Sequence, residues 1–379
     1  MMTTKPKVLV ALSGGVDSSV AAFLLQKAGY EVTGCFMKFW QDSRLGRENP
    51  CCSPEAERRA RILARRLQIP FFVLDLKKEF KKAVVDYFLS RTRLGLTPNP
   101  CVVCNEEIKF GLFLKKALER GADFMATGHY AKIKEGRLFK AKDKEKDQSY
   151  FLWRLNQTQL SRVIFPIGDY SKNEVRKIAQ KAGLSTAKTP DSQNLCFLAS
   201  GTSQFLKFNL RQKPGNIIAR SDISGILPAI DTAGEIIGRH QGLGLYTIGQ
   251  RGGIGPCLFP KFQSQGPYYV LRKNRLKNLL VVTRNEKDLF IQEFKVSDLV
   301  LNLVKHKWPL RVMVKIRSRQ KEMPATLSPV LNLVKHNQPE KIDQFLVRLD
   351  RPERAVTPGQ SAVFYQGQEL LGGGIISAA

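Results

Sequence analysis

Residues 7–19 read KVLVALSGGVDSS, and this stretch decides the fold of the chain. Its first part is apolar and contains β-branched residues, which predicts a buried parallel strand. Apolar residues recur at helical spacing from Val16 onward, directly after the Ser-Gly-Gly turn. The stretch therefore predicts a strand, a glycine loop and a helix, a unit whose backbone N–H groups and helix dipole bind anions.

Two further features of this loop favour a nucleotide as the anion. No lysine follows the glycines as it does in the phosphate-binding loop of kinases. Instead, Asp17 offers a carboxylate suited to Mg²⁺, and Ser13, Ser18 and Ser19 offer hydroxyls. This set suits cleavage between the α- and β-phosphates of ATP, whereas a glycine turn that only joins a strand to a helix would not need it. The stretch resembles the PP-loop of the N-type ATP pyrophosphatases, enzymes that adenylate a carbonyl oxygen.

The composition indicates a polyanionic partner and a reducing compartment. The chain has 379 residues, enough for two or three domains, and carries 61 Lys and Arg against 33 Asp and Glu, a net charge of +28. Nucleic acid is the natural partner of such a protein, although a generally basic proteome is an alternative explanation. We expect no membrane segment and no leader, because no apolar run is long enough and the first strand begins near residue 7. Seven cysteines, an odd number, favour reduced thiols and a cytoplasmic location.

Strand and helix signals alternate along the first half of the chain, which predicts an α/β fold with a doubly wound parallel sheet. Expected strands cover 30–39, 71–76 and 123–127, and expected helices cover 54–67 behind a Ser53 cap, 77–90, 105–120 and 171–182. The proline-containing stretch 91–104 is expected to be an ordered loop. We predict a catalytic domain over 1–204, a small β-rich adaptor domain over 205–284, and a C-terminal β-barrel over 285–379.

Three cysteines are candidates for chemistry. Cys101 and Cys104 form a CxxC pair, which alone is compatible with half a zinc site or a redox pair, but no second CxxC or HxxxH accompanies it, so no metal site is expected. At the start of the expected helix 105–120, Cys104 should have a lowered pKa, because a helix N-terminus favours the thiolate. Cys196 lies in a second polar loop and could meet Cys104 over one pocket. The adjacent Cys51-Cys52 pair is expected to be non-catalytic, with a role in packing or in the loop structure on the nucleotide side.

Eight motifs in order along the chain resemble the tRNA-specific 2-thiouridylases of the MnmA type, over essentially its full length. They are SGGVDSS (13–19), CCSPEAE (51–57), TPNPCVVCNEEIKF (97–110), ATGHYAKI (126–133), KDQSYFLWRL (146–155), DSQNLCF (191–197), GLGLYTIGQRGGIG (242–255) and PGQSAVFYQGQELLGGGII (358–376). The resemblance implies a PP-loop domain of the adenine nucleotide α-hydrolase-like type, an adaptor, and a barrel that helps to hold tRNA. It also implies thiolation of C2 of the wobble uridine (position 34) of tRNA. The reaction would use ATP and sulfur carried as a persulfide, supplied by a desulfurase or a relay protein.

The resemblance also implies a role for individual residues. Cys196 matches the cysteine that carries the persulfide, and Cys104 matches its partner nucleophile. Positions matching the ATP site are Ala11, Leu12, Ser13, Gly14, Gly15, Val16, Asp17, Ser18, Met37 and Gly128. Positions matching tRNA contacts are Asn99, Pro100, Cys101, His129, Lys146, Asp147, Gln148, Arg317, Ser318 and Gln360. His129 has a structural alternative, a hydrogen bond at a strand end, and Lys146 has another, a solvated surface lysine.

Two positions depart from the family pattern. Cys101 stands where some members have an aspartate, and Ser318 stands where a tyrosine is frequent, which removes a stacking surface. Cys101 also opens a minority alternative, in which Cys101, Cys104 and Cys196 hold a [4Fe–4S] cluster with one open iron. Two other functions remain possible at this point: a PP-loop ligase that acts on a small metabolite, and a tRNA-binding protein without catalysis.

Overall fold

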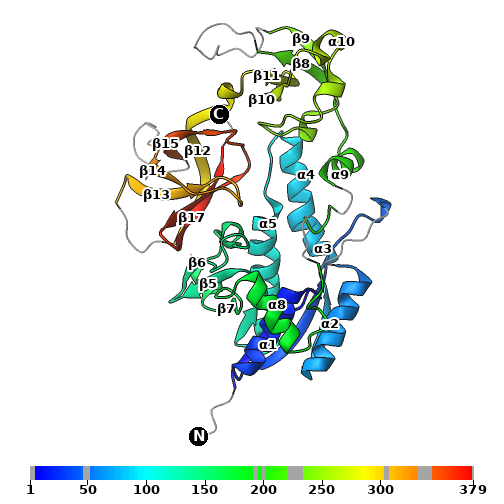
Figure 1. Cartoon of the computed structure of the whole chain (residues 1–379), viewed down its shortest axis with the longest axis vertical. Helices are drawn as coiled ribbons and strands as arrows, with labels where there is room; N and C mark the ends of the chain where they lie inside the picture. Colours follow the sequence, from blue (N-terminus) through cyan, green and yellow to red (C-terminus); the bar gives the residue numbers. More distant parts are fainter. Residues whose placement is uncertain are drawn as a thin grey trace, which may run out of the picture.

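Three β-sheets organise the chain. The computed structural model describes residues 5–45, 52–190, 195–198, 201–220, 234–302, 307–330 and 344–377. An α/β region with the N-terminus lies at one end of the elongated molecule, a small β-rich region lies at the other, and a barrel lies beside them (Figure 1). This is the predicted fold class; the exact domain boundaries stay a prediction. Within the described ranges, no helix is long and apolar enough to cross a membrane.

The α/β region is built on a five-stranded parallel sheet with the order β3-β2-β1-β4-β7. The strands are β1 (Lys7–Ala11), β2 (Glu31–Lys38), β3 (Phe71–Asp75), β4 (Phe124–Ala126) and β7 (Val163–Ile164). Strand order reverses between β1 and β4, and ligands of such sheets bind beyond the carboxyl ends of the strands at this point. The topology therefore directs attention to the loops that follow β1 and β4.

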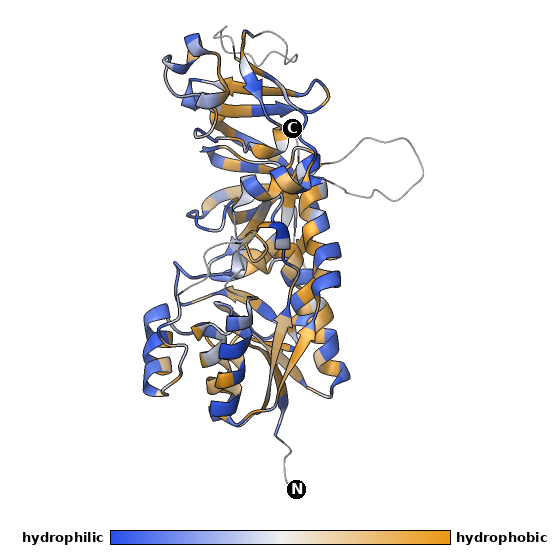
Figure 2. Ribbon diagram, turned by 90° about the vertical axis from the view of Figure 1, so that its right-hand side faces the viewer, coloured by the Kyte–Doolittle hydropathy of each residue, from blue (hydrophilic) through white to orange (hydrophobic). Residues whose placement is uncertain are grey.

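Helices cover both faces of this sheet, as a doubly wound fold requires. Val8 and Val10 of β1 belong to one core with α1 and α2, while Leu9 and Ala11 belong to a second core on the opposite face. Figure 2 shows hydrophobic colours along these strands and hydrophilic colours on the outer sides of the helices. The helices of this region are α1 (Val16–Lys27), α2 (Pro54–Leu67), α3 (Lys77–Phe80), η2 (Lys81–Val85), α4 (Asp86–Arg93), α5 (Pro100–Val103), η3 (Cys104–Phe113), α6 (Leu114–Glu119), α7 (Gln157–Leu160) and α8 (Lys172–Lys181), with short 3₁₀ turns η1 (Ser43–Leu45) and η4 (Ser149–Phe151).

Local signals placed most of these helices correctly. The Ser53 side chain accepts a hydrogen bond from the Ala56 amide at 3.2 Å, so it caps α2 as predicted. The segment α3–η2–α4 runs on to Arg93, and the next helix begins at Pro100 rather than at residue 105. The expected loop 91–104 is therefore only six residues long, 94–99. A proline at the first helical position explains this, because its missing N–H needs no partner there.

The middle region is a four-stranded sheet with the order β10-β11-β8-β9. Its strands are β8 (Gly215–Ala219), β9 (Ile236–His240), β10 (Tyr269–Asn274) and β11 (Leu279–Thr283), accompanied by α9 (Thr202–Asn209), η5 (Leu243–Leu245), η6 (Gly255–Cys257) and α10 (Pro260–Gln263). Its own apolar core includes Ile217, Val270 and Leu280. This core supports the predicted β-rich adaptor as a separate packing unit.

The C-terminal region is a closed barrel. Strands run in the order β12-β15-β14-β13-β16-β17, and β12 also pairs with β17, which closes the ring. After the turn η7 (Glu286–Leu289), the strands are β12 (Phe290–Leu301), β13 (Leu310–Lys315), β14 (Met323–Pro329), β15 (Phe345–Arg354), β16 (Ser361–Gln366) and β17 (Glu369–Ile376). Closure leaves no long unpaired edge. The barrel prediction is thus confirmed.

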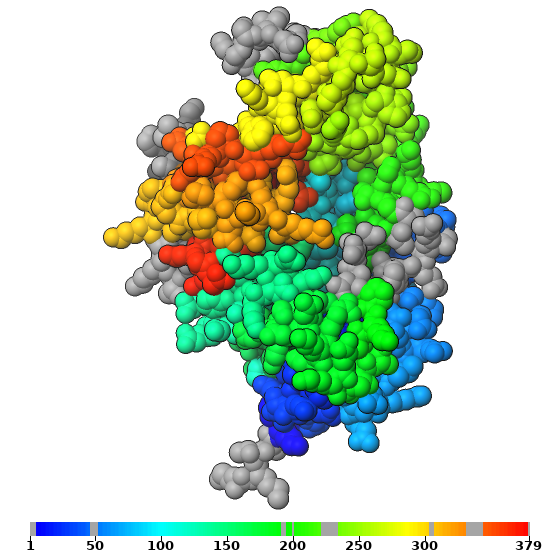
Figure 3. Space-filling view, in the orientation of Figure 1, coloured from blue at the N-terminus to red at the C-terminus, as the bar shows by residue number. Residues whose placement is uncertain are grey.

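The barrel and the α/β region form one continuous structure. A hairpin of the α/β region, β5 (Ala131–Lys134) and β6 (Arg137–Lys140), joins the barrel sheet through a pairing of β6 with β17. The Tyr150 hydroxyl donates to the Ser361 carbonyl at 2.8 Å, and the Trp153 indole N–H donates to the Ser361 hydroxyl at 3.1 Å. In the space-filling view, the orange and red barrel packs directly on the turquoise hairpin segment (Figure 3). The barrel therefore has a defined position relative to the nucleotide loop.

Candidate active site

A cavity of about 430 Å³ lies where the sheet topology predicts a ligand. It opens beyond the carboxyl ends of β1, β2 and β4. Of the positions predicted for ATP, the cavity is lined by Ala11, Leu12, Ser13, Gly15, Val16, Asp17, Ser18, Met37 and Gly128. Gly14 is instead packed against α2, where the Arg59 Nε donates to its carbonyl at 3.1 Å. The residues predicted to bind the nucleotide thus surround one cavity, except Gly14, which packs against α2 behind the cavity wall.

The loop after β1 leaves the start of α1 available to an anion. Gly15 is the N-cap residue of α1 and provides no side-chain cap. The Ser13 and Ser18 hydroxyls lie 3.2 Å apart, and Ser18 also donates to the Gly15 carbonyl at 3.1 Å. The uncapped N–H groups of the first helical turn, together with these two hydroxyls, can therefore donate hydrogen bonds to an anion such as a phosphate.

Two glycines make this arrangement possible. Gly14 has a φ of +73°, and a Cβ there would lie 2.3 Å from the Ala56 carbonyl oxygen. A Cβ on Gly128 would lie 2.6 Å from the Ser18 amide nitrogen. Only glycine permits the loops after β1 and β4 to approach so closely. Gly128 therefore holds the second loop against the start of α1.

Asp17 is paired with a lysine that the sequence did not single out. The Lys172 ammonium lies 2.8 Å from both Asp17 carboxylate oxygens, and the Tyr130 hydroxyl donates to Oδ1 at 2.7 Å. The Lys172 side chain is 11% exposed and lines the cavity. The positive charge of Lys172 therefore lies beside the loop, next to the position where phosphates would bind. The signal for its location was the Ser171 and Glu174 capping box, which places Lys172 at the first position of α8.

His129 follows β4 and lies buried in the cavity wall. Its Nδ1 is 2.6 Å from the Thr127 hydroxyl, and its Nε2 is 3.4 Å from the Lys109 ammonium. An ammonium has no acceptor, so Nε2 accepts and Nδ1 carries the proton. Burial, and then the charge of Lys109, hold the pKa of His129 well below its usual value. His129 thus makes the hydrogen bond at a strand end that its structural alternative predicts. Its side chain also lines the cavity.

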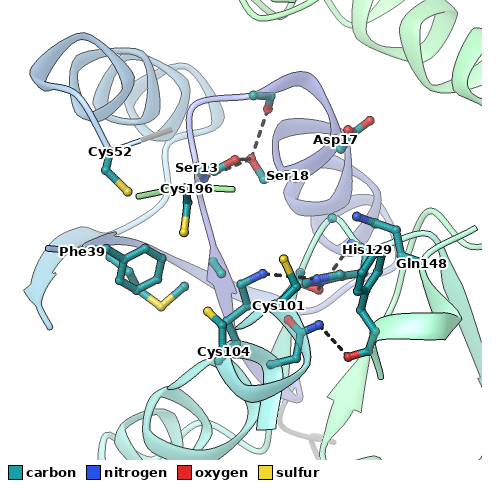
Figure 4. Close-up of a pocket in the computed structure, with 18 of the residues that line it drawn as sticks. Ser13, Asp17, Ser18, Phe39, Cys52, Cys101, Cys104, His129, Gln148 and Cys196 are labelled. Carbon is teal, nitrogen blue, oxygen red and sulfur yellow. Dashed lines mark hydrogen bonds between the residues drawn. The ribbon is translucent and has the colours of Figure 1, made fainter. Parts of the chain in front are cut away.

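Four cysteines line this same cavity: Cys52, Cys101, Cys104 and Cys196. Figure 4 shows them around one opening, on the far side of the cavity from Asp17. The described cysteines are all free thiols. The structure therefore brings Cys104 and Cys196 together, as predicted, although 92 residues separate them in the chain. Cys52, expected to serve packing or the loop structure on the nucleotide side, also lines the cavity. Asp191 to Asn194 of the predicted polar loop lie outside the described residues.

The prediction that Cys104 lies at a helix N-terminus and has a lowered pKa is wrong. The helix begins at Pro100, so Cys104 lies in its second turn and is buried. Burial raises the pKa of Cys104, and the nearby Lys109 charge opposes this. Burial likewise raises the pKa of Cys101 to about 12 and that of Cys196 well above 9, with further increases from the neighbouring thiols. Burial therefore favours the protonated form of Cys101, Cys104 and Cys196, because a thiolate loses its hydration inside the cavity.

The thiols do not fit an iron–sulfur cluster as they stand. Within the described ranges, no three His, Cys, Asp or Glu side chains are grouped closely enough to hold one metal ion. A cluster on Cys101, Cys104 and Cys196 would need three thiolates directed at one point.

The positions predicted for tRNA fall into two groups. Pro100, Cys101, His129, Lys146 and Gln148 line the cavity. The buried Asn99 stands at the N-cap position of the helix that carries the CxxC pair, without a capping hydrogen bond from its side chain. Asp147 differs, because its carboxylate is 3% exposed and accepts hydrogen bonds from the Ala141 amide and the Ser149 hydroxyl. Its side chain is therefore committed to an internal turn.

The second group lies on the barrel. Arg317 is exposed and donates to the carbonyls of Arg354 and Ala355, next to the half-buried Ser318. Gln360 donates to the Thr97 carbonyl at 2.9 Å, and Thr97 in turn donates to the Pro358 carbonyl at 2.9 Å. Two hydrogen bonds thus connect the barrel to the loop that precedes the CxxC pair.

Sequence comparisons identify the family of the chain. Three family models cover the chain: the tRNA methyl transferase HUP domain over residues 6–200, the tRNA methyl transferase PRC-barrel domain over 203–284, and the aminomethyltransferase beta-barrel domain over 291–376. The tRNA-specific 2-thiouridylase MnmA of Chloroflexus aurantiacus is 43% identical over 378 residues, 98% of each chain. The chain belongs to the MnmA family. Other MnmA proteins are similarly close: that of Clostridioides difficile is 41% identical over 99% of each chain, and that of Thermus thermophilus is 41% identical over 98% of this chain and 94% of its own.

Proposed function

We propose that this MnmA-family chain is a sulfurtransferase that uses ATP to replace the C2 oxygen of the wobble uridine (position 34) of tRNA by sulfur. One observation carries the proposal: an ATP-type loop and the thiols of Cys104 and Cys196 line a single cavity. Adenylation takes place at O2 and sulfur transfer at C2 of the same carbonyl group, so both sets of groups must reach one bound base. The curated relatives, which bear the name of this activity, support the same conclusion.

The nucleotide end of the cavity would activate the base. The first-turn N–H groups of α1 and the hydroxyls of Ser13 and Ser18 would hold the phosphates. The uracil O2 attacks the α-phosphorus, the bond to the bridging oxygen breaks, and pyrophosphate leaves. Asp17 is the one carboxylate among the described residues of the cavity wall, and a carboxylate with phosphate oxygens suits Mg²⁺, which would neutralise phosphate charge.

The thiol end would then deliver sulfur. The terminal sulfur of a persulfide on Cys196 attacks C2 of the adenylated base. The Cys104 thiolate attacks the inner sulfur of Cys196 and breaks the persulfide S–S bond. The terminal sulfur keeps the bonding electrons and AMP leaves with the former O2. A Cys104–Cys196 disulfide results, and a two-electron thiol reductant must restore both thiols before another turnover.

The partners follow from this chemistry. Sulfur would come from a desulfurase or a persulfide relay protein, and the need for reduced thiols favours the cytoplasm. The target base would enter beside Asn99, Pro100 and Cys101, in the cavity that His129, Lys146 and Gln148 also line. The barrel positions Arg317, Ser318 and Gln360 would contact more distant tRNA backbone.

Nucleoside mass spectrometry of tRNA after incubation with ATP, Mg²⁺ and a persulfide donor tests the proposal. We expect 2-thiouridine at position 34, with pyrophosphate released only when tRNA is present. Pyrophosphate release with a small carboxylic or amide substrate, and none with tRNA, would indicate a ligase instead. Binding of tRNA without any pyrophosphate release would contradict catalysis altogether. Iron analysis of anaerobically purified protein decides between the persulfide route and a cluster.

A further inference from the structure

Lys109 lies on the wall of the cavity that the thiols share, and the winding of its helix places it there. It follows Cys104 by five residues within η3, a π-helical stretch. A π-helix pairs residue i with residue i+5, so residues five apart face the same side, which in an α-helix they do not. Gly111 allows this winding, because a Cβ there would lie 2.7 Å from the Glu106 carbonyl oxygen, five residues earlier. Cys104 and Lys109 therefore both line the cavity.

Among the residues that the structure describes, the Lys109 ammonium has no acidic partner. Its one hydrogen-bond contact among the described residues is His129, which accepts from it at 3.4 Å, and no described carboxylate forms an ion pair with it. The other charged or titratable groups of the described wall are Asp17, Tyr130, Lys146 and Lys172, besides the cysteines and His129. Asp17 is occupied by Lys172. A half-buried cation without a carboxylate is best compensated by nearby groups that can become anions, and here these are thiols.

The three thiols predicted for chemistry share this one cation. The charge of Lys109 lowers the pKa of Cys101, Cys104 and Cys196 and so counteracts the increase that burial causes in each. No other positive charge within the described ranges acts on all three of these thiols. Cys104 belongs to η3, like Lys109, whereas Cys196 comes from a different loop. The charge of Lys109 therefore acts on both cysteines that are proposed to react.

We propose that Lys109 is a positioning residue whose ammonium, oriented by His129, stabilises the thiolates of Cys104 and Cys196. Each thiol loses its proton to water, and the anion remains beside the ammonium. The extension to the persulfide anion on Cys196 rests on the proposed function, whereas the effect on the two thiolates does not.

Alkylation with iodoacetamide tests this without ATP, tRNA or a sulfur donor. Peptide mass spectrometry gives the rate at each cysteine between pH 6.5 and 9.5. We expect Lys109→Met to slow labelling of Cys104 and Cys196 about tenfold at pH 7.5, the effect of about one pKa unit. Lys109→Arg should stay within about threefold of wild type, because it keeps the charge. Cys257, in the middle region, is the internal reference.

Two further variants separate charge from structure. Lys115→Met removes an exposed lysine of the same helical segment and should change nothing. Lys109→Gln keeps a donor for His129 without the charge, so it should react as slowly as Lys109→Met even if the methionine variant folds poorly. Wild-type labelling rates in Lys109→Gln would overturn the proposal. Weakened tRNA binding with unchanged labelling would mean that Lys109 serves a phosphate instead, and would also overturn it. Failure of tRNA thiolation alone would count against the proposed function and not against this inference.

Discussion

The two ends of the cavity are built in opposite ways. At the nucleotide end, the residues from Ala11 to Ser18 are consecutive, and a strand, a turn and a helix set their order in space. Contacts from α2, Gly128 and Lys172 support this single segment. At the thiol end, Cys52, the CxxC pair and Cys196 come from three segments, and Lys109 and His129 orient the surroundings. The nucleotide end is a local motif, whereas the thiol end exists only in the folded protein. If this comparison is right, changes at one end should leave the other intact.

The largest expected effect is the loss of thiolation in Cys196→Ser. Without a sulfur carrier, 2-thiouridine formation should fall on the order of a thousandfold or more, as for removal of a covalent nucleophile. Release of pyrophosphate in the presence of tRNA should persist, because the nucleotide end is untouched. Nucleoside mass spectrometry and a pyrophosphate assay measure the two, with Cys257→Ser as the matched control. Normal thiolation by Cys196→Ser would assign the carrier to another cysteine.

Asp17→Ala should give the reverse pattern. We expect adenylation to fall about 10²- to 10³-fold, because the site loses a preorganised charge. Iodoacetamide labelling of Cys104 should match wild type. Asp169→Ala, an exposed carboxylate paired with Lys132, is the control. Altered labelling of Cys104 would show that the two ends are coupled, against the comparison above.

The thiol end should show a steep pH dependence that the nucleotide end lacks. Burial raises the pKa of Cys196 well above 9, so its thiolate fraction grows about tenfold for each pH unit from 7 to 9. Alkylation of Cys196 should rise with the same slope, while ATP affinity stays flat in this range. A plateau in the alkylation rate below pH 8 would mean that the thiol is ionised at rest.

Gly128→Ala should disturb the contact between two loops of the nucleotide end. The new Cβ would meet backbone atoms of Asp17 and Ser18, which cannot move without shifting α1. We expect a loss of about 1–3 kcal/mol in the free energy of unfolding, together with weaker ATP binding. Denaturant unfolding and ATP titration measure these, and Gly252→Ala, with open space around it, is the control. Unchanged stability and affinity would contradict the close approach.

The smallest effect is expected for Gln360→Ala on the barrel. Loss of its hydrogen bond to the Thr97 carbonyl should cost about 1 kcal/mol, or roughly a fivefold decrease in kcat/KM for tRNA. Labelling of Cys101 without tRNA should become faster, because the loop 94–99 is held less firmly. The exposed Gln366→Ala is the control. Slower thiolation with unchanged labelling would favour direct contact with tRNA over positioning of the loop.

The start of the CxxC helix shows where prediction from the sequence failed. Pro98 and Pro100 predict a loop, although a proline also occurs at the first position of helices. The segment before Pro100 is bonded to the barrel through Thr97 and Gln360, which are more than 250 residues apart in the chain. The error moved Cys104 from a helix terminus to a buried second turn. The predicted sign of its pKa shift was therefore wrong.

The sequence by itself determined the parallel sheet, the anion-binding start of α1 and the barrel, because these follow from hydrophobic periodicity and turn residues over short segments. It also named Cys104 and Cys196, the two cysteines proposed to react, through the family motifs. Only the tertiary structure decided that Lys172 holds Asp17, that Lys109 and Cys52 reach the thiols, and that the Asp147 side chain serves an internal turn. Such charges and burial are set by segments far apart in the chain, and the energy of a charge depends on everything that surrounds it.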